Sequence, residues 1–172
     1  MAILPDVLRP GLRIVFCGSA AGRFSAQAGA YYAHPRNKFW PTLYRIGLTP
    51  RRLAPEQFGE LPKYGMGLTD LCKTEFGADS ELSPAADDPE GLKRKIDFFQ
   101  PRVLAFVGKR PAKVFLKGIF LKRSVAYGPQ PEKIGRTAIF VLPSPAPTAR
   151  AYWDESWWHK LAASYRPHCR GC

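Results

Sequence analysis

Four short apolar runs divide the chain, and each is apolar on both faces instead of alternating with polar residues. They cover residues 12–17, 66–71, 103–107 and 138–142. Runs of this kind are typical of strands in a parallel sheet that is covered by helices on both sides. The pattern therefore predicts a central, mainly parallel, four-stranded sheet.

Helical periodicity fills the intervals between these runs. Apolar positions recur at helix-like spacing in residues 37–46, 89–99, 110–116 and 154–165. Strands that alternate with helices predict a three-layer α/β/α fold. With 172 residues, the chain has the length of a single domain, and we expect one domain over its whole length.

The charge balance adds a prediction about the partner. Lysine and arginine number 26 against 14 acidic residues, so the formal net charge is +12. An excess of this size indicates a nucleic-acid partner, because Lys and Arg contacts to phosphate release condensed counterions. The plainer alternative is a charge that only aids solubility.

The apolar segments also bear on where the protein works. The chain has no apolar stretch of about 20 residues, so we expect no membrane span and no membrane partner. Its first residues do not resemble a secretory signal, which predicts a cytoplasmic protein. We expect a monomer.

The four cysteines predict no metal and no cofactor. Cys17 and Cys72 end apolar runs, where a free thiol behaves as a small hydrophobic side chain. Cys169 and Cys172 form a lone C-x-x-C with only His168 nearby, whereas a closed zinc site needs four ligands.

The carboxyl ends of parallel strands meet at one edge of a sheet, and ligands collect there. Four loops are expected to surround one crevice at this edge, namely residues 18–22, 70–73, 108–109 and 144–150. The turn at residues 18–22 consists of Gly, Ser and Ala and exposes backbone N–H groups, but it matches neither phosphate-binding pattern. A tight turn that only packs on the sheet is the alternative.

An aromatic run, YYAHPRNKFW, covers residues 31–40. Phe39 and Trp40 open a predicted helix with an apolar face, so we expect them in the core. Tyr32 precedes Pro35 in a segment that is biased away from helix, and its ring is a candidate for stacking on a base. The Asn37 amide suits a base edge or a water molecule, and equally a helix N-cap.

Two further positions have both a chemical and a plain structural interpretation. Asp70 ends a strand, where a carboxylate orients water or balances a developing cation, or caps the next turn. The loop at residues 144–150 holds two prolines in its middle and ends at Arg150, which suits a wedge pressed into a duplex or a rigid turn. The aromatic residues after it have a helical rhythm that predicts core positions: Tyr152, Trp153, Trp157 and Trp158.

Taken in order, these segments resemble the uracil-DNA glycosylase superfamily over about residues 12–165. The similarity is closest to the mismatch-specific uracil/thymine branch and the deoxyinosine (hypoxanthine) branch. The aromatic run is its most specific part, and the Gly-x-x-x-Gly turn at 18–22 is the first family motif. Residues 67–71, 107–109 and 142–150 match later segments.

The resemblance implies a set of functional residues. The implied base-binding residues are Gly18, Ser19, Ala20, Ala21, Gly22, Tyr32, His34, Asn37, Phe39 and Ser144. The implied DNA contacts are Lys109, Pro147, Thr148, Ala149 and Arg150. The main departure is Ala20, which stands where the mismatch-specific branch has an asparagine that positions the attacking water. Either another group positions the water, with Asn37 and Asp70 as the candidate catalytic residues, or the enzyme relies on stabilisation of the leaving base alone. Ser144 and Pro147 also depart from the family, replacing an asparagine and a glycine.

The resulting expectation is a monofunctional glycosylase that excises a deaminated base, uracil first, from double-stranded or single-stranded DNA in base-excision repair. Three alternatives stay open: a hypoxanthine-DNA glycosylase, a weakly catalytic or non-catalytic protein that binds damaged DNA, and an α/β domain that binds a nucleotide or another small ligand.

Overall fold

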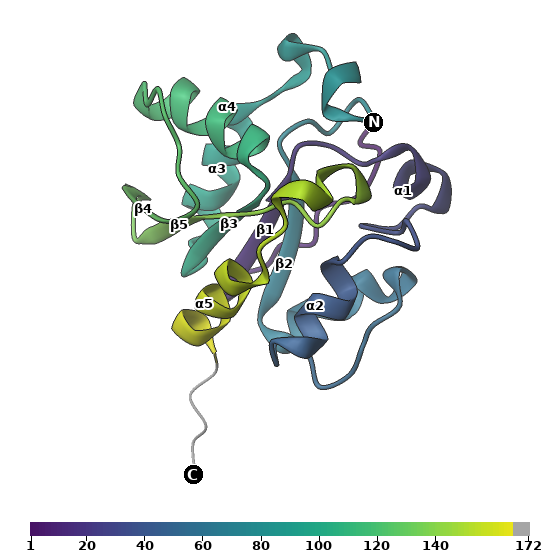
Figure 1. Ribbon diagram of the computed structural model, residues 1–172. Helices are drawn as coiled ribbons and strands as arrows, with labels where there is room; N and C mark the ends of the chain where they lie inside the picture. The colour runs from purple at the N-terminus through teal and green to yellow at the C-terminus, as the bar shows by residue number, and fades with distance from the viewer. Residues whose placement is uncertain (167–172) are drawn as a thin grey trace.

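A five-stranded sheet forms the middle layer of the computed structural model, which describes residues 1–166 (Figure 1). The strand order is β2-β1-β3-β5-β4. Four strands are parallel: β1 (Ile14–Gly18), β2 (Met66–Asp70), β3 (Val103–Val107) and β5 (Thr137–Leu142). The three strands from β1 to β3 are buried along their whole length, as continuous apolar runs predict. The predicted α/β/α class with a mainly parallel sheet is confirmed.

The fifth strand, β4 (Gly128–Ile134), corrects the prediction of four strands. It pairs antiparallel with β5 and lies at the edge of the sheet. Its sequence, GPQPEKI, contains two prolines and has no apolar run. Prolines cannot donate to a sheet ladder, but an edge strand has one side that needs no donor. The sequence pattern therefore does not reveal β4, because its prolines are tolerated only at the edge of the sheet.

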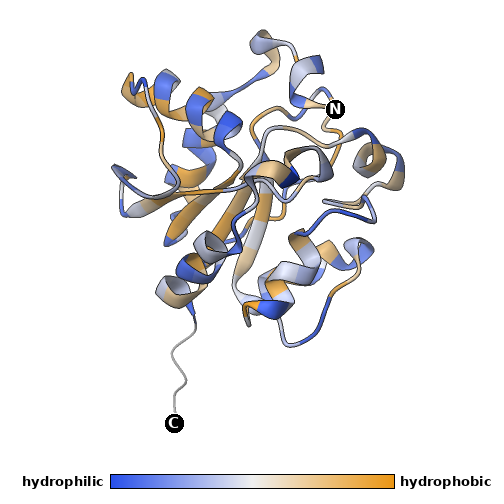
Figure 2. Ribbon diagram, viewed as in Figure 1, coloured by the Kyte–Doolittle hydropathy of each residue, from blue (hydrophilic) through white to orange (hydrophobic). Residues whose placement is uncertain are grey.

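Two layers of helices cover the sheet. One layer contains α2 (Phe39–Arg45) and α5 (Glu155–Tyr165), whose buried residues pack with those of one sheet face. The other layer contains α3 (Pro89–Phe99) and α4 (Lys109–Phe120), which pack on the opposite face. Figure 2 shows the apolar colour concentrated on the central strands between these layers. The remaining helical segments are α1 (Arg23–Ala28), η1 (Pro55–Tyr64), η2 (Asp79–Glu81), η3 (Pro84–Ala86) and η4 (Pro147–Tyr152).

The N-terminal segment covers the outer edge of β2. Val7 and Leu68 form an antiparallel bridge, with N–H···O distances of 2.8 and 2.9 Å in the two directions. This bridge satisfies part of an edge that would otherwise expose unpaired backbone groups. It also fixes Asp6 beside β2, which matters for the site described below.

The aromatic residues divide between core and surface. Phe39, Trp40 and Trp158 are buried, in agreement with their predicted core positions. Tyr152 is 71% exposed, so its predicted place in the core is wrong. The reason is that residues 147–152 form the short 3-10 helix η4, which breaks the helical rhythm before α5 begins.

Cys17 and Cys72 are buried free thiols, whereas Cys169 and Cys172 lie outside the described residues. Within residues 1–166, no three His, Cys, Asp or Glu side chains come close enough together to hold a metal ion. None of the helices in this part of the chain combines the length and the apolar character that a bilayer span requires.

Candidate active site

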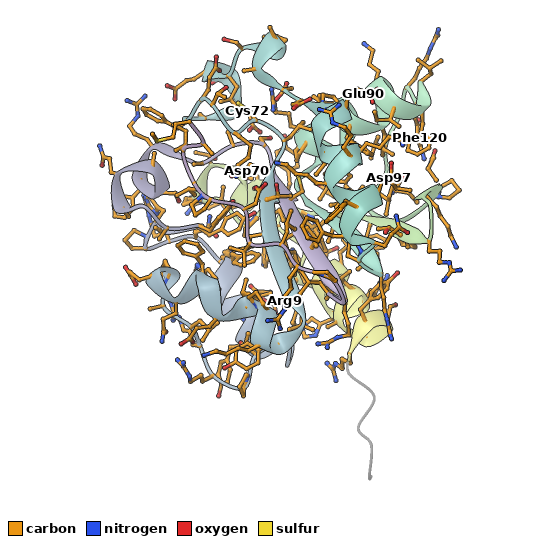
Figure 3. The ribbon with its side chains drawn as sticks, turned by 180° about the vertical axis from the view of Figure 1, so that it is seen from behind. Arg9, Asp70, Cys72, Glu90, Asp97 and Phe120 are labelled. Carbon is orange, nitrogen blue, oxygen red and sulfur yellow. The ribbon has the colours of Figure 1, made fainter. Side chains whose placement is uncertain are left out.

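The site is built where β1 and β2 end side by side. Gly18 and Asp70 are direct partners in the parallel register of these strands. Beyond them the two chains stay together, because the N–H of Leu71 donates to Gly18 O at 2.9 Å and that of Cys72 to Ser19 O at 2.7 Å. The turn after β1 is thereby fixed against the loop that carries Asp70, and Figure 3 labels Asp70 at this end of β2.

Because Gly18 has no side chain, two polar groups approach β1 closely at this residue. A Cβ atom on this residue would lie 2.9 Å from Asp70 Oδ1 and 3.3 Å from the Tyr32 hydroxyl. The Asp70 carboxylate at the end of β2 and the Tyr32 hydroxyl of the aromatic segment therefore converge at the end of β1. We call Gly18, Ser19, Tyr32 and Asp70 together the Asp70 site.

Tyr32 reaches this site through an unusual backbone conformation. Its φ of 53° is in the left-handed region, which is an outlier for a bulky side chain. The flanking residues hold it there. Trp40 Nε1 donates to Tyr31 O at 2.9 Å, and the N–H of Ala33 donates to Ser25 Oγ at 3.1 Å. Strain that the surroundings maintain in this way is common at functional sites.

The Tyr32 ring is stacked on Phe39, with 4.1 Å between ring centroids and 26° between ring planes. One ring face is thus taken by the core, while the side chain as a whole is half-buried. Phe39 itself is fully buried and supports Tyr32 from behind. The structure therefore places Phe39 beneath the predicted base-binding ring and not at the surface of the site.

Two hydroxyls of the Asp70 site lack partners. Within the described part of the chain, Ser19 Oγ and the Tyr32 hydroxyl are the buried side-chain oxygen or nitrogen atoms without a hydrogen bond. Leaving a buried polar group unpaired costs about 1–3 kcal/mol. That both such groups belong to one small site is the feature expected of a place that binds a polar ligand.

Asp70 is a buried carboxylate, only 5% exposed. Desolvation raises its pKa to about 6, against the opposing effect of Lys73, whose Nζ is 3.9 Å from Asp70 Oδ2. The group is therefore mostly ionised at pH 7 and close to the range in which it can accept a proton. Burial likewise raises the pKa of Tyr32 well above its usual value, so its hydroxyl remains a donor.

His34 and Asn37 lie on another side of Tyr32. Together with Tyr32 they line a cavity of about 380 Å³ that also includes Trp40, Leu53 and neighbouring residues, and which we call the His34 cavity. Gly18, Ser19, Asp70 and Ser144 are not among its lining residues. The predicted base-binding residues therefore divide into two groups around the Tyr32 ring.

Local hydrogen bonds occupy part of both side chains. His34 Nδ1 accepts from the N–H of Arg36 at 3.1 Å, and its ring is edge-on to Phe24. Asn37 Oδ1 accepts from the N–H of Phe39 at 2.9 Å, in the turn that precedes α2. The N-cap interpretation of Asn37 is wrong by one residue, because Lys38 occupies the N-cap position of α2. The Asn37 amide nitrogen keeps two donors.

The loop after β5 borders the site on its other side. Ser144 lies against Gly108, whose Cβ position would be 3.4 Å from Ser144 Cβ, and Pro145 O accepts from the N–H of Lys38 at 3.0 Å. The loop is therefore tied to the aromatic segment. Beyond it η4 carries the predicted DNA contacts, of which Thr148 and Arg150 are exposed and Pro147 and Ala149 half-buried.

Lys109 begins α4 at the end of β3, as the prediction required for a residue near the crevice. Its Nζ lies over the ring of Tyr127, 4.5 Å from the ring centroid. Contacts of this kind hold a lysine at a fixed place on the surface.

The sequence prediction placed Lys73 in the crevice loop at residues 70–73 without giving it a role, and it missed Ser25 and Asp6. Lys73, Ser25 and Asp6 come from three separate segments and have no motif of their own. Tyr152 was predicted for the core but is exposed at the end of η4. Only the position of Lys73, three residues after Asp70, offered a signal.

The fold and the site together define an α/β protein with a buried carboxylate and unpaired hydroxyls at the carboxyl edge of a parallel sheet. Its sequence matches the family profile of the Uracil DNA glycosylase superfamily over residues 5–164, and the chain belongs to this superfamily.

Among solved structures, the chain is similar to the solution NMR structure of a proposed uracil DNA glycosylase from Methanosarcina acetivorans. The TM-score is 0.62 at 23% sequence identity, and the match covers 91% of this chain and 92% of that one. At this identity the likeness concerns the fold. The predicted superfamily is confirmed by the sequence match.

Proposed function

We propose that the protein is a monofunctional DNA glycosylase that flips a deaminated base out of DNA, uracil first, and hydrolyses its N-glycosidic bond. Membership of the superfamily supports a glycosylase that acts on DNA. The single observation that carries the proposal is the Asp70 site. There, the buried Asp70 carboxylate and the unpaired Tyr32 hydroxyl converge on Gly18, and the hydroxyl of the neighbouring Ser19 is also buried without a partner.

The chemistry of this bond explains why such groups belong together. As the bond breaks, positive charge develops on the sugar and negative charge on the departing base. Donors aimed at the base and an acceptor near the sugar stabilise the two charges separately. In the proposal, Ser19 Oγ and the main-chain N–H groups of the turn at 18–22 face the base, and Asp70 faces the sugar and the water.

Asp70 is the better of the two candidate catalytic residues for handling the water. A neutral amide is not basic at neutral pH, so Asn37 cannot take a proton from water, and its Oδ1 already accepts from the N–H of Phe39. Asp70 is ionised at neutral pH, and the Tyr32 hydroxyl points at the same space. We assign the water to Asp70 and Tyr32, and the remaining Asn37 donors to the edge of the base.

The Tyr32 ring supplies the stacking surface in this proposal, through the face opposite Phe39. Stacking of a base on an aromatic ring stabilises binding by about 1–3 kcal/mol. Ser144 and the proline-rich loop close the other side, with Arg150 on η4 placed to enter the duplex when the base leaves the stack. Flipping costs a few kcal/mol and least for a weak pair, which favours uracil opposite guanine.

The experiment is release of free base from oligonucleotides under single-turnover conditions. The substrates are duplexes with uracil opposite guanine or adenine, hypoxanthine opposite thymine and thymine opposite guanine, and a single strand with uracil. We expect uracil opposite guanine to react fastest. Asp70→Asn should lower that rate by about 10²–10⁴-fold, as for loss of a general base.

Asn37→Ala provides the comparison, because it should weaken substrate binding more than the chemical step. Faster release of hypoxanthine than of uracil would assign the deoxyinosine specificity instead. If no base is released at excess enzyme while DNA binding is intact, the protein is a non-catalytic DNA-binding protein and not an enzyme.

A further inference from the structure

A group of charged side chains behind Asp70 is not used by the proposed reaction. Lys73 Nζ lies 2.9 Å from Asp6 Oδ1 as well as 3.9 Å from Asp70 Oδ2. The second oxygen of Asp6 is 2.6 Å from Lys95 Nζ, and the Thr69 hydroxyl donates to Asp6 Oδ1 at 2.7 Å. Two lysines and two carboxylates thus form a chain of alternating charge that ends in the Asp70 site.

Lys73 is held at the centre of this chain from several directions. Its Nζ donates to the Tyr31 hydroxyl at 3.0 Å, and that hydroxyl donates to Pro5 O at 3.0 Å. Its main-chain O accepts from the N–H of Ile3 at 2.8 Å. With 16% of its side chain exposed, Lys73 has little freedom to turn toward solvent.

Three separate parts of the chain bring the charges together. Asp6 comes from the N-terminal segment that Val7 fixes to β2, Lys95 comes from α3, and Lys73 follows β2 itself. Lys73 belongs to the predicted crevice loop at residues 70–73, but its Nζ is held by Asp6 and the Tyr31 hydroxyl. Their arrangement therefore needs an explanation other than contact with the phosphates.

We propose that Lys73 is a positioning residue, clamped by Asp6 and Tyr31 so that it keeps the Asp70 carboxylate ionised and directed into the Asp70 site. This inference rests on the proposed function, in which Asp70 takes part in the chemistry. Asp6 also opposes this effect. Its carboxylate lies closer to Lys73 than Asp70 does, and so it offsets part of the positive charge that stabilises the ionised Asp70.

The electrostatic effects on Asp70 have opposite signs. Desolvation raises its pKa, Lys73 lowers it, Asp6 raises it and Lys95 lowers it. The other titratable groups that face Asp70 are the Cys17 thiol of β1 and the phenols of Tyr31 and Tyr32, all of whose pKa values are raised, so they stay neutral at working pH.

Because Lys73 and Asp6 affect the pKa of Asp70 in opposite directions, their removal should have opposite effects, which general damage to the fold would not produce. Lys73→Met should move the acid limb of the pH–rate profile toward higher pH by about 1–3 pH units, the effect of removing an opposite charge at this distance. Asp6→Asn should move the limb toward lower pH, because the charge that opposes ionisation of Asp70 is gone. Lys73→Arg keeps the charge and should stay close to the parent.

The measurement combines two readouts on the full chain. The first is the pH titration of the Asp70 carboxyl carbon by ¹³C NMR in the free protein. The second is single-turnover base release between pH 4.5 and 9 from the duplex with uracil opposite guanine. Lys93→Met, which removes an exposed lysine paired with Asp97 on α3, is the matched control and should change neither.

The outcomes separate this inference from the proposed function. An active parent whose Asp70 titration is unchanged in Lys73→Met, or moves the same way in Lys73→Met and Asp6→Asn, overturns the role of Lys73. An inactive parent on every substrate overturns the proposed function instead. If Lys73→Met does not fold, Lys95→Met takes its place, with a smaller shift toward higher pH expected.

Discussion

Asp70→Asn tests the physical state of the site without any substrate. Burial raises the pKa of this carboxyl from 3.8 to about 6 in the folded protein. The difference between these values corresponds to about 3 kcal/mol of stability at 1.36 kcal/mol per pH unit. Asparagine has nearly the same shape and no charge, so it removes the cost of ionising a buried group.

The sign of the effect follows from proton binding. Between pH 4 and pH 6 the folded protein binds more protons at Asp70 than the unfolded chain does, so the stability of the parent falls as pH rises. Below pH 3.8 both states hold the proton, and above about pH 6 both have lost it. The stability of Asp70→Asn relative to the parent should therefore rise by about 2.5 kcal/mol from pH 4 to pH 8.

Urea unfolding of both proteins at pH 4, 5, 6, 7 and 8 measures this difference. Asp97→Asn is the control, since Asp97 is an exposed carboxylate paired with Lys93 on α3 and should change stability by at most about 0.5 kcal/mol. The stability of Asp70→Asn relative to the parent could instead stay flat with pH or fall as pH rises. Either result would refute the conclusion that burial raises the pKa of Asp70.

Three further substitutions probe the geometry of the site. Gly18→Ala should lower base release by about 10²-fold, because its Cβ would displace Asp70. Gly59→Ala in η1, which has nothing within 4 Å of its Cβ position, should keep full activity; equal rates for the two variants would contradict the arrangement. Tyr32→Phe should stabilise the free protein by about 1 kcal/mol in thermal unfolding, since it removes an unpaired buried hydroxyl. A loss of stability would mean that this hydroxyl has a partner. Arg150→Ala should lower kcat/KM about tenfold more on a duplex than on a single strand, because the wedge offsets part of the unstacking cost; an equal loss on both would remove the wedge.

The sequence pattern predicted the parts of the fold that burial alone decides. The strands β1, β2 and β3 are buried on both faces, so their apolar runs mark them to within two residues at either end. The edge strand β4 depends on pairing with β5, and its prolines give the opposite signal. The superfamily followed from the order of the motifs, above all the aromatic run.

The arrangement of the site was only partly predictable. Parallel pairing places Asp70 next to Gly18 by a general rule of sheet topology. The left-handed conformation of Tyr32 depends on Trp40 and Ser25, and no local pattern reveals it. The approach of Asp6 to Lys73 likewise arises from the N-terminal bridge to β2, a long-range contact that composition and spacing do not encode.

A crystal structure of Asp70→Asn bound to a duplex with uracil opposite guanine tests the central claim most directly, because slow cleavage should preserve the substrate. We predict a flipped uracil stacked on the outer face of Tyr32, with a polar atom within hydrogen-bond distance of Ser19 Oγ. A uracil that lies in the His34 cavity without any contact to Ser19 or Asp70, or one that stays in the duplex, would contradict it.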